Sequence, residues 1–417
     1  MSCGTALRFA VVHRDGRARA SELTLPHGTT LTPIFMPVGT NATIKGLSTA
    51  SNLAGTGCTM LLANTYHLCQ RPGSQVVAQN GGVHQFMKYS GNVLTDSGGF
   101  QMVSLIALST LDERGVTFES PNDGSTMLLT PEASISAQHD IGADVIMALD
   151  DVVSSVTVDD QRFLEATDRT LRWLDRCLDQ HEPRKDIQAL FAIVQGGLDV
   201  SPTGLRQRCL DGFRLRDQRI PGYAIGGVAG GEGKDSFWKV VDFCCQSLPQ
   251  HKPRYLMGVG DPMDIVVCVA LGVDMFDCVF PTRTARFGTA LTRFGSLNLK
   301  LSAYQKDFSP VEPGCDCNAC GGGGSGERYY SKALFHQMFK SSEQSNFAGS
   351  MLSHHNIAYM LRLSTNMRSA IAAGKYGEFV HTFLRDRYGG EPGWEQTKVP
   401  GWVRDALRAA GVEWHQV

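Results

Sequence analysis

Short apolar runs recur along the chain between residues 34 and 281, and most of them end in or beside Gly, Asp, Asn or Gln. Continuous apolar runs are typical of strands that are buried on both faces, as in a parallel sheet. The pattern therefore predicts strands at 34–40, 58–65, 92–99, 144–151, 190–197, 222–228, 254–260 and 275–281.

The segments between these runs carry signals for helices. A Thr-Pro pair at 130–131 places a capping residue before a first-turn proline, and Ser-Pro at 201–202 and Asp-Pro at 261–262 repeat the device. Between residues 158 and 181, apolar side chains recur at the spacing of one helix face. Eight strands alternating with helices predict an α/β fold, a closed (β/α)8 TIM barrel. An open doubly wound sheet is the alternative, but polar residues end nearly every strand, which favours the barrel.

Chemistry-bearing residues follow the predicted strands. In a barrel the carboxyl ends of all strands meet at one mouth, where active sites lie. Each strand-end aspartate could instead cap the helix that follows it. Three carboxylates together with an amide favour a shared pocket. The residues concerned are Asn64, Asp96, Asp150, Gln195, Gly226, Gly227, Gly258 and Asp277.

Three cysteines lie within six residues, at Cys315, Cys317 and Cys320. Such spacing suits tetrahedral zinc, and a fourth ligand could come from either His354 or His355. Three thiolates and an imidazole leave no position for water, so the expected zinc ion is structural, one per chain. The alternative is a reduced cluster without metal.

The charge of the chain excludes a binder that works through bulk positive charge. Lys and Arg number 39 against 41 Asp and Glu, a net charge of −2. Residues 280–417 nevertheless hold 16 basic against 11 acidic residues, whereas the first 279 hold 23 against 30. An anionic partner is therefore expected to meet the C-terminal third. We find neither a secretory signal nor an apolar run of membrane-spanning length, and we expect an intracellular, cytoplasmic protein, with a nuclear or mitochondrion-associated location as the alternative. Its twelve cysteines are then expected to be core residues or metal ligands.

Several long motifs resemble those of the tRNA-guanine transglycosylases. They are LTDSGGFQ (94–101), VQGG (194–197), AIGGVAGGE (224–232), MFDCVFPTRTARFG (275–288) and the CxCxxC…HN pattern, and the similarity runs from about residue 8 to about 390. The resemblance implies a TIM barrel with a zinc-binding subdomain inserted near its C-terminal end. We expect most of the barrel in 1–300, the zinc subdomain in 301–365, and a C-terminal segment in 366–417 that completes the barrel or docks on it.

The resemblance also implies an activity, the exchange of guanine at the tRNA wobble position for a 7-deazaguanine. Asp277 matches the nucleophile that forms a covalent aspartyl-ribosyl intermediate, and Asp96 matches the general acid/base. This pairing suits an exchange with retained stereochemistry, which needs two displacements and one group that gives and takes a proton. The target base must leave the anticodon stack to reach the pocket.

The remaining roles come from the same motif matches. Asp150, Gln195 and Gly227 match groups that read the purine edge, with Phe100 and Met257 on its two faces. Arg283 and Arg286 match positions that hold the anticodon loop. Cys315, Cys317, Cys320 and His355 match the zinc ligands, His355 because it directly precedes the motif's Asn356.

Small residues suggest the eukaryotic branch of the family, which inserts queuine into tRNAs with a GUN anticodon. Gly230 stands where bacterial relatives carry a branched apolar residue, and it would leave room for queuine's cyclopentenediol. A simple turn glycine is the alternative. That branch pairs its catalytic chain with a homologous non-catalytic subunit, so a heterodimer is expected and a homodimer is possible.

Two other functions are weighed against this one. A non-catalytic homologous subunit would lose the paired aspartates, but Asp96 and Asp277 stand in intact motifs. A hydrolytic glycosidase would not need Gln195, Gly227 or the PTRTAR motif. The tract at 321–326, GGGGSG, departs from the family pattern and lengthens the loop before His355; loop closure depends weakly on length, so zinc binding should survive.

Overall fold

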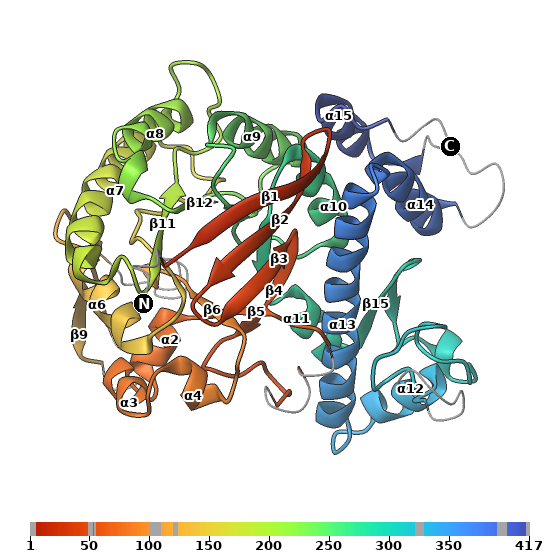
Figure 1. Cartoon of the computed structure of the whole chain (residues 1–417). Coiled ribbons are helices and arrows are strands. Elements are labelled where there is room, and N and C mark those ends of the chain that lie inside the picture. The colour runs from red at the N-terminus through yellow and green to blue at the C-terminus, as the bar shows by residue number, and fades with distance from the viewer. Residues whose placement is uncertain are drawn as a thin grey trace.

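A closed barrel of eight parallel strands forms the centre of the computed structural model (Figure 1). The structure describes residues 6–48, 53, 56–99, 110–119, 124–321, 329–389 and 398–413. The last barrel strand pairs with the first, which confirms the barrel over the open sheet. The barrel strands are β4 Ile34–Gly39, β5 Met60–Ala63, β6 Asn92–Thr95, β10 Val145–Met147, β11 Ala189–Val194, β12 Gly222–Ile225, β13 Arg254–Leu256 and β14 Met275–Cys278.

Helices surround the barrel, as the alternating pattern predicts. Every residue of β4 and of β11 is buried, because the outer face of each strand packs under helices and the inner face fills the barrel. The helices are α2 Thr65–Gln70, α3 Ser74–Gln79, α4 Val83–Met87, α6 Pro131–Ile141, α7 Asp160–His181, α8 Leu205–Arg214, α9 Lys234–Ser247, α10 Pro262–Leu271, α11 Phe280–Arg286, α12 Lys332–Lys340, α13 Ser345–Ala372, α14 Tyr376–Tyr388 and α15 Gly401–Ala409. Short 3-10 turns occupy Glu182–Arg184, Asp217–Arg219 and Ser302–Tyr304.

Two of the three predicted helix starts are confirmed. The side chain of Thr130 accepts a hydrogen bond from the first turn of α6, and Asp261 does the same for α10. The Ser-Pro pair at 201–202 does not begin α8, which starts at Leu205 after Gly204. The N–H of Gly204 bonds the carbonyl of Ser201 at 2.9 Å, so this pair belongs to a turn that precedes the helix.

A three-stranded antiparallel sheet lies across one end of the barrel (Figure 1). Its strands are β1 Arg8–Asp15, β2 Ala18–Leu25 and β3 Gly28–Thr32. The buried guanidinium of Arg19 on β2 bonds Asp274, the residue before β14, at 2.8 Å. The contact is to the N-terminal end of a barrel strand, so this sheet closes the floor and leaves the mouth at the opposite end.

The chain leaves the barrel after α11 and returns along α13. The excursion contains β15 Thr289–Thr292, β16 Gly295–Asn298, α12 and the cysteine cluster. Helix α13 then packs on β4, where Ser364 accepts a hydrogen bond from the N–H of Phe35 at 3.2 Å, so α13 serves as the eighth barrel helix. Figure 1 shows α13 as a long rod beside the barrel, and α15 packs on α9 and α10. A further small sheet comprises β7 Thr110–Leu111, β8 Val116–Glu119 and β9 Thr126–Leu129.

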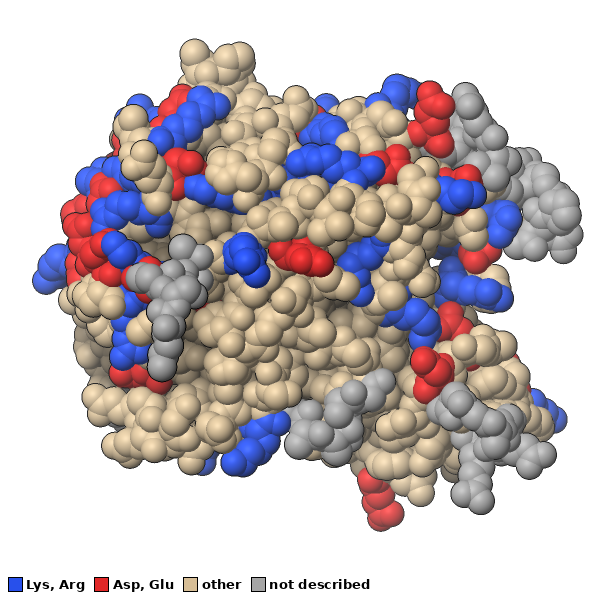
Figure 2. Space-filling view, in the orientation of Figure 1, with Lys and Arg blue, Asp and Glu red and all other residues tan. Residues whose placement is uncertain are grey.

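Charges of both signs alternate on the surface of α7 and α8. Figure 2 shows basic and acidic side chains interleaved at the edge of the molecule where these helices lie. Arg208 of α8 bonds Asp168 of α7 at 2.7 Å, and Arg216 pairs with Asp175. In the part of the chain that the structure describes, no helix combines the length and apolar character that crossing a membrane requires.

Candidate active site and metal centre

The three predicted carboxylates lie at carboxyl ends of barrel strands. Asp96 directly follows β6, Asp150 lies three residues beyond β10, and Asp277 is the second-last residue of β14. Asp96 and Asp150 are buried, and Asp277 is half-buried. Burial raises the pKa of Asp277 to about 6, and the negative charge of Asp96 adds to the rise. The two aspartates therefore act on each other across the mouth of the barrel.

Asp277 is held by one of its two carboxylate oxygens. The Tyr255 hydroxyl and the N–H of Gly258 both donate to Oδ1, the second at 2.9 Å. These two bonds favour the ionised form and partly offset the effect of burial on its pKa. Among the described residues, both hydrogen bonds to this carboxylate reach Oδ1, and Oδ2 remains open to a further partner. Tyr255 lies on β13 beside β14, a pairing that the sequence pattern does not reveal.

Asp96 is fixed by the segment that follows β5. The side-chain amide of Asn64 donates to Oδ2 at 2.5 Å, and the N–H of Thr65 donates to Oδ1 at 2.9 Å. Thr65 also donates from its hydroxyl to the carbonyl of Asp96 at 2.6 Å. The first residues of α2 thus orient this carboxylate. Asn64 was expected at the mouth, and its contact with Asp96 gives it a positioning role.

Asp150 and Gln195 meet at the mouth. The side-chain amide of Gln195 donates to Oδ2 of Asp150 at 2.7 Å, and the hydroxyl of Ser97 donates to Oδ1 at 3.3 Å. Burial raises the pKa of Asp150 to about 7, and the neighbouring carboxylate of Asp151 contributes to the rise. Sequence reasoning missed Ser97, although it directly follows Asp96 in the motif.

Two glycines follow the end of β12, and the first of them adjoins Gln195. Gly227 has φ +67°, and a Cβ there would lie 2.4 Å from Oε1 of Gln195. Gly230 lies near Ser155, whose Oγ would be 2.9 Å from a Cβ at position 230. The Ser155 hydroxyl donates to Glu232 at 2.7 Å, and the same carboxylate accepts the N–H of Gly230 at 2.9 Å. Ser155 and Glu232 are therefore further residues of the site.

The structure also places the remaining predicted residues. Met257 directly follows β13, and its side chain packs against the apolar core inside the barrel. Arg283 and Arg286 lie on α11, exposed, and neither forms an ion pair with a described residue. Phe100 lies outside the described residues.

Cys315, Cys317, Cys320 and His355 converge in a buried cluster. Nδ1 of His355 lies 3.7, 3.4 and 3.4 Å from the three sulfurs. Tetrahedral zinc, with bonds of about 2.3 Å to sulfur and 2.0–2.1 Å to nitrogen, separates such ligand atoms by about 3.6 Å. Nε2 of His355 bonds the carbonyl of Leu291 at 2.8 Å, which leaves Nδ1 as the ligand atom. The donor set therefore fits a metal ion, and His355 rather than His354 completes it.

Comparison with known proteins decides the family. A model of the queuine tRNA-ribosyltransferase family matches residues 15–389. The chain belongs to this family.

Individual relatives of the queuine tRNA-ribosyltransferase family match almost the whole chain. The queuine tRNA-ribosyltransferase catalytic subunit of Schizosaccharomyces pombe is 46% identical over 415 residues, 98% of each chain. The catalytic subunit of Caenorhabditis elegans is 45% identical over 414 residues, 97% of this chain and 99% of its own. The queuine tRNA-ribosyltransferase of Thermus thermophilus is 46% identical over 405 residues, 97% and 98%. These matches confirm the resemblance and the enzyme class, a pentosyltransferase.

A second cluster of residues of the types that bind metals lies at the floor of the barrel. Asp144, fully buried, accepts from His27 at 2.7 Å and from His84 at 3.0 Å, and the two imidazole rings stack at 3.5 Å. These separations are hydrogen-bond distances, shorter than the roughly 3.3 Å between nitrogen and oxygen ligands of a tetrahedral ion with bonds near 2.0 Å. We therefore interpret this cluster as a clamp between the β2–β3 turn and the barrel floor.

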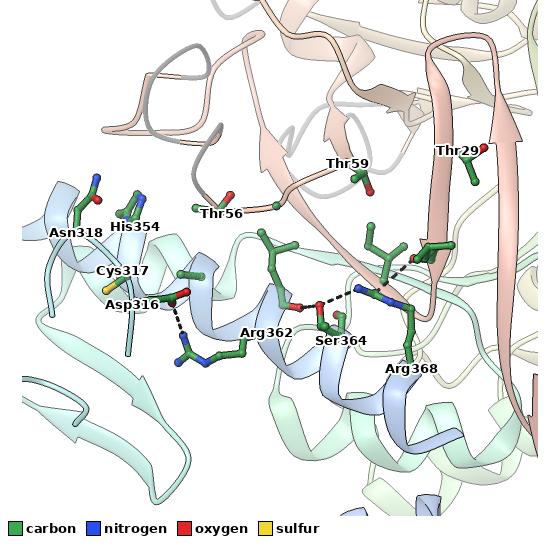
Figure 3. Close-up of a pocket in the computed structure, with 16 residues that line it drawn as sticks. Thr29, Thr56, Thr59, Asp316, Cys317, Asn318, His354, Arg362, Ser364 and Arg368 are labelled. Carbon is green, nitrogen blue, oxygen red and sulfur yellow. Dashed lines mark hydrogen bonds and ion pairs between the residues drawn. The ribbon is translucent and has the colours of Figure 1, made fainter. Parts of the chain in front are cut away.

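A cavity of about 470 Å³ lies between α13, β3 and the cysteine cluster (Figure 3). Arg362 and Arg368 of α13 contribute to its lining, and both are already engaged. Arg362 pairs with Glu312 at 2.6 Å, and Arg368 donates to the carbonyl of Pro33 at 2.8 Å. None of the mouth aspartates lines this cavity, so it is separate from the cluster of carboxylates at the strand ends.

Proposed function

We propose that this chain exchanges guanine at the tRNA wobble position for queuine through a covalent aspartyl-ribosyl intermediate. The observation that carries the proposal is the pair Asp277 and Asp96, two strand-end carboxylates close enough for one to raise the pKa of the other. Its membership of the queuine tRNA-ribosyltransferase family supports the same reaction.

Asp277 is proposed as the nucleophile. Its Oδ2 attacks C1′ of the ribose, a bond forms between oxygen and carbon, and the bond from C1′ to the base nitrogen breaks with its electrons leaving on guanine. A pKa of about 6 keeps most of this carboxylate ionised at neutral pH, which nucleophilic attack requires. Tyr255 and Gly258 hold Oδ1 and so fix the direction of attack.

Asp96 is proposed as the acid and then the base. Protonated, it gives its proton to the departing guanine and becomes a carboxylate. The incoming base then loses its ring proton to Asp96, attacks C1′ and expels Asp277, which returns both groups to their starting states. The hydrogen bonds from Asn64 and Thr65 hold the carboxylate in place through both steps.

The purine edge is proposed to be read by Asp150, Gln195 and the N–H of Gly227. Asp150 can accept from the ring N–H and amino groups of a guanine-like base, while Gln195 and Gly227 donate to its carbonyl. The bond that joins Asp150 to Gln195 supports this, because it holds an acceptor and a donor side by side. Phe100 and Met257 are proposed to enclose the faces of the flipped base.

Queuine is proposed as the incoming base because of Gly230. A branched side chain there would occupy space within 2.9 Å of the Ser155 hydroxyl, so glycine keeps this part of the site open. Overall identity does not separate the branches, since the eukaryotic and bacterial relatives are both 46% identical. The choice therefore rests on the residues around Gly230.

A structural zinc ion is proposed for Cys315, Cys317, Cys320 and His355, where it would hold the segment between β15 and α12 against α13.

Arg283 and Arg286 are proposed to contact phosphates of the anticodon stem-loop, which their exposure on α11 supports. A homologous non-catalytic subunit is the proposed partner in a heterodimer, as the name of the Schizosaccharomyces pombe relative, a catalytic subunit, suggests. The eleven described cysteines form no disulfide among themselves, which is compatible with a reducing compartment, and we propose the cytoplasm.

The test is release of labelled guanine from tRNA when queuine or unlabelled guanine is added, with and without a co-purified partner subunit. Wild-type protein should release label and form a tRNA adduct that survives denaturing electrophoresis when the reaction is stopped. Asp277→Asn, which keeps the shape of the side chain but removes the nucleophile, should do neither. Lack of release by the wild-type complex, or normal release by Asp277→Asn, would contradict the proposed mechanism.

A further inference from the structure

Arg206 is a fully buried arginine that sequence reasoning did not single out. It lies in the first turn of α8, directly behind the loop that follows β11. No described carboxylate forms an ion pair with it, whereas the other fully buried arginine, Arg19, is paired with Asp274. An unpaired buried cation is costly to keep, so its hydrogen bonds deserve a functional explanation.

The guanidinium of Arg206 contacts the buried thiol of Cys244, and its three hydrogen bonds to oxygen all go to backbone carbonyls at the mouth end of two neighbouring strands. Nε donates to the carbonyl of Gly197 at 2.8 Å, and one terminal nitrogen donates to Val194 at 2.8 Å. The other terminal nitrogen donates to Gly226 at 2.7 Å. One planar group therefore ties the end of β11 to the end of β12.

The bond to Gly226 determines the orientation of a peptide group. The carbonyl of Gly226 and the N–H of Gly227 belong to one planar trans peptide, in which the two bonds point in opposite directions. Because the carbonyl points into the protein toward Arg206, the N–H of Gly227 points away from it. Glycine at both positions leaves this peptide free to rotate, so an external anchor is needed to select one orientation.

We propose that Arg206 is a positioning residue, which holds the Gly226–Gly227 peptide so that the Gly227 N–H faces the carbonyl of the bound purine. The inference rests on the proposed function, in which that N–H donates to the base. By also holding Val194 and Gly197, the guanidinium fixes the two ends of the segment that carries Gln195. Both donors to the purine carbonyl thus depend on one buried side chain.

The test compares two bases as competitors of labelled guanine in the exchange reaction. Guanine offers an oxygen acceptor at the relevant position, whereas 6-thioguanine keeps the ring N–H and amino donors but presents a weakly accepting sulfur. In Arg206→Met the inhibition constant of guanine should rise about tenfold while that of 6-thioguanine rises little, because a hydrogen bond to the oxygen is lost. The affinity for tRNA should not change.

Arg254→Met is the matched control. Arg254 is also buried and also donates to backbone carbonyls, those of Leu248 and Gly272, but at the floor of the barrel. The Arg254→Met substitution should lower the melting temperature of the protein without changing the ratio of the two inhibition constants. Arg206→Lys, which retains a cationic donor, should give an intermediate ratio and is read in the same way if Arg206→Met does not fold.

The possible failures are distinguishable. Equal rises for both bases in the Arg206 variants, or no rise for either, would overturn the positioning role while leaving the exchange activity intact. Absence of exchange by the wild-type complex would instead contradict the proposed function itself. The proposal is supported if the ratio of the inhibition constant of guanine to that of 6-thioguanine rises in Arg206→Met and stays unchanged in Arg254→Met.

Discussion

Replacing Gly227 with alanine should have two effects, backbone strain and a steric effect on base recognition, which a control substitution can separate. Its φ of +67° is a left-handed conformation that side chains rarely adopt, and a Cβ would lie 2.4 Å from Oε1 of Gln195. Such an approach is closer than Cβ contacts allow, so the flexible end of Gln195 must shift, and this weakens its 2.7 Å bond to Asp150. Gly227→Ala therefore disturbs both halves of the proposed base-reading pair.

The two contributions can be estimated separately. A left-handed conformation costs a residue with a Cβ about 1–2 kcal/mol, which lowers the stability of the protein. Loss of a hydrogen bond to a charged partner costs about 1.5–3 kcal/mol, and this part acts on the site. At about 1.4 kcal/mol per tenfold, Gly227→Ala should raise the KM for guanine roughly tenfold to a hundredfold.

Gly374→Ala is the control because its φ of +65° is nearly the same and a Cβ there would meet nothing within 4 Å. Both variants should lose similar stability in urea unfolding, but only Gly227→Ala should bind guanine weakly in the exchange assay. An unchanged KM in Gly227→Ala would refute the reasoning, since the contact with Gln195 would then not matter for the base. Equal activity losses in both variants would refute it as well.

Three further substitutions test other parts of the structure. Tyr255→Phe removes a hydrogen bond that favours ionised Asp277, so its pKa should rise above about 6 and the acid limb of the kcat/KM profile should move to higher pH; a shift to lower pH would contradict this. Cys317→Ser should release the metal, measured as about one zinc per wild-type chain. Arg19→Met leaves Asp274 as a buried unpaired charge and should cost about 3–5 kcal/mol in urea unfolding; a loss below about 1 kcal/mol would contradict it.

The sequence predicts the barrel well because a strand that is buried on both faces is a continuous run of apolar residues. Each of the eight predicted runs overlaps a barrel strand, although β11 begins at Ala189 rather than 190, β12 ends at Ile225 rather than 228 and β5 begins at Met60 rather than 58. Boundaries shift because the predicted runs include flanking turn residues, such as Gly226 and Gly227 after β12, that lie outside the strand. The predicted start of α8 is wrong for a different reason. Ser-Pro is compatible with both a helix start and a turn, and the hydrogen bond from the N–H of Gly204 to the carbonyl of Ser201 shows that it forms a turn here.

Motif positions identify the side chains that carry charge, but not the groups that hold them. The contact of Asn64 with Asp96 crosses between two strand ends, and Arg206 reaches its carbonyls from the helix behind the sheet. Neither relation has a fixed sequence spacing. The same applies to Glu232, whose bond to Ser155 joins loops that are 77 residues apart. Such partners become visible only when the barrel brings the strand ends together.

Two aspartates at the mouth of the barrel, Asp150 and Asp277, differ from the carboxylates at its floor in the partners that they have. At the floor, Asp274 is paired with Arg19, and His27 and His84 together hold the pKa of Asp144 below its usual range despite burial that raises it. At the mouth, Asp150 and Asp277 have no Lys or Arg partner among the described residues, and burial raises the pKa of each, to about 7 and about 6. A paired carboxylate stabilises the fold above the pKa of its unfolded form, and that contribution is lost as pH falls through the folded pKa. A carboxylate with a raised pKa lowers stability at neutral pH instead, and the proposed exchange accounts for that cost because it needs groups that gain and lose bonds and protons near pH 7. Ion pairs and histidine contacts therefore hold the floor carboxylates, whereas Asp150 and Asp277 are the mouth carboxylates that suit the proposed reaction.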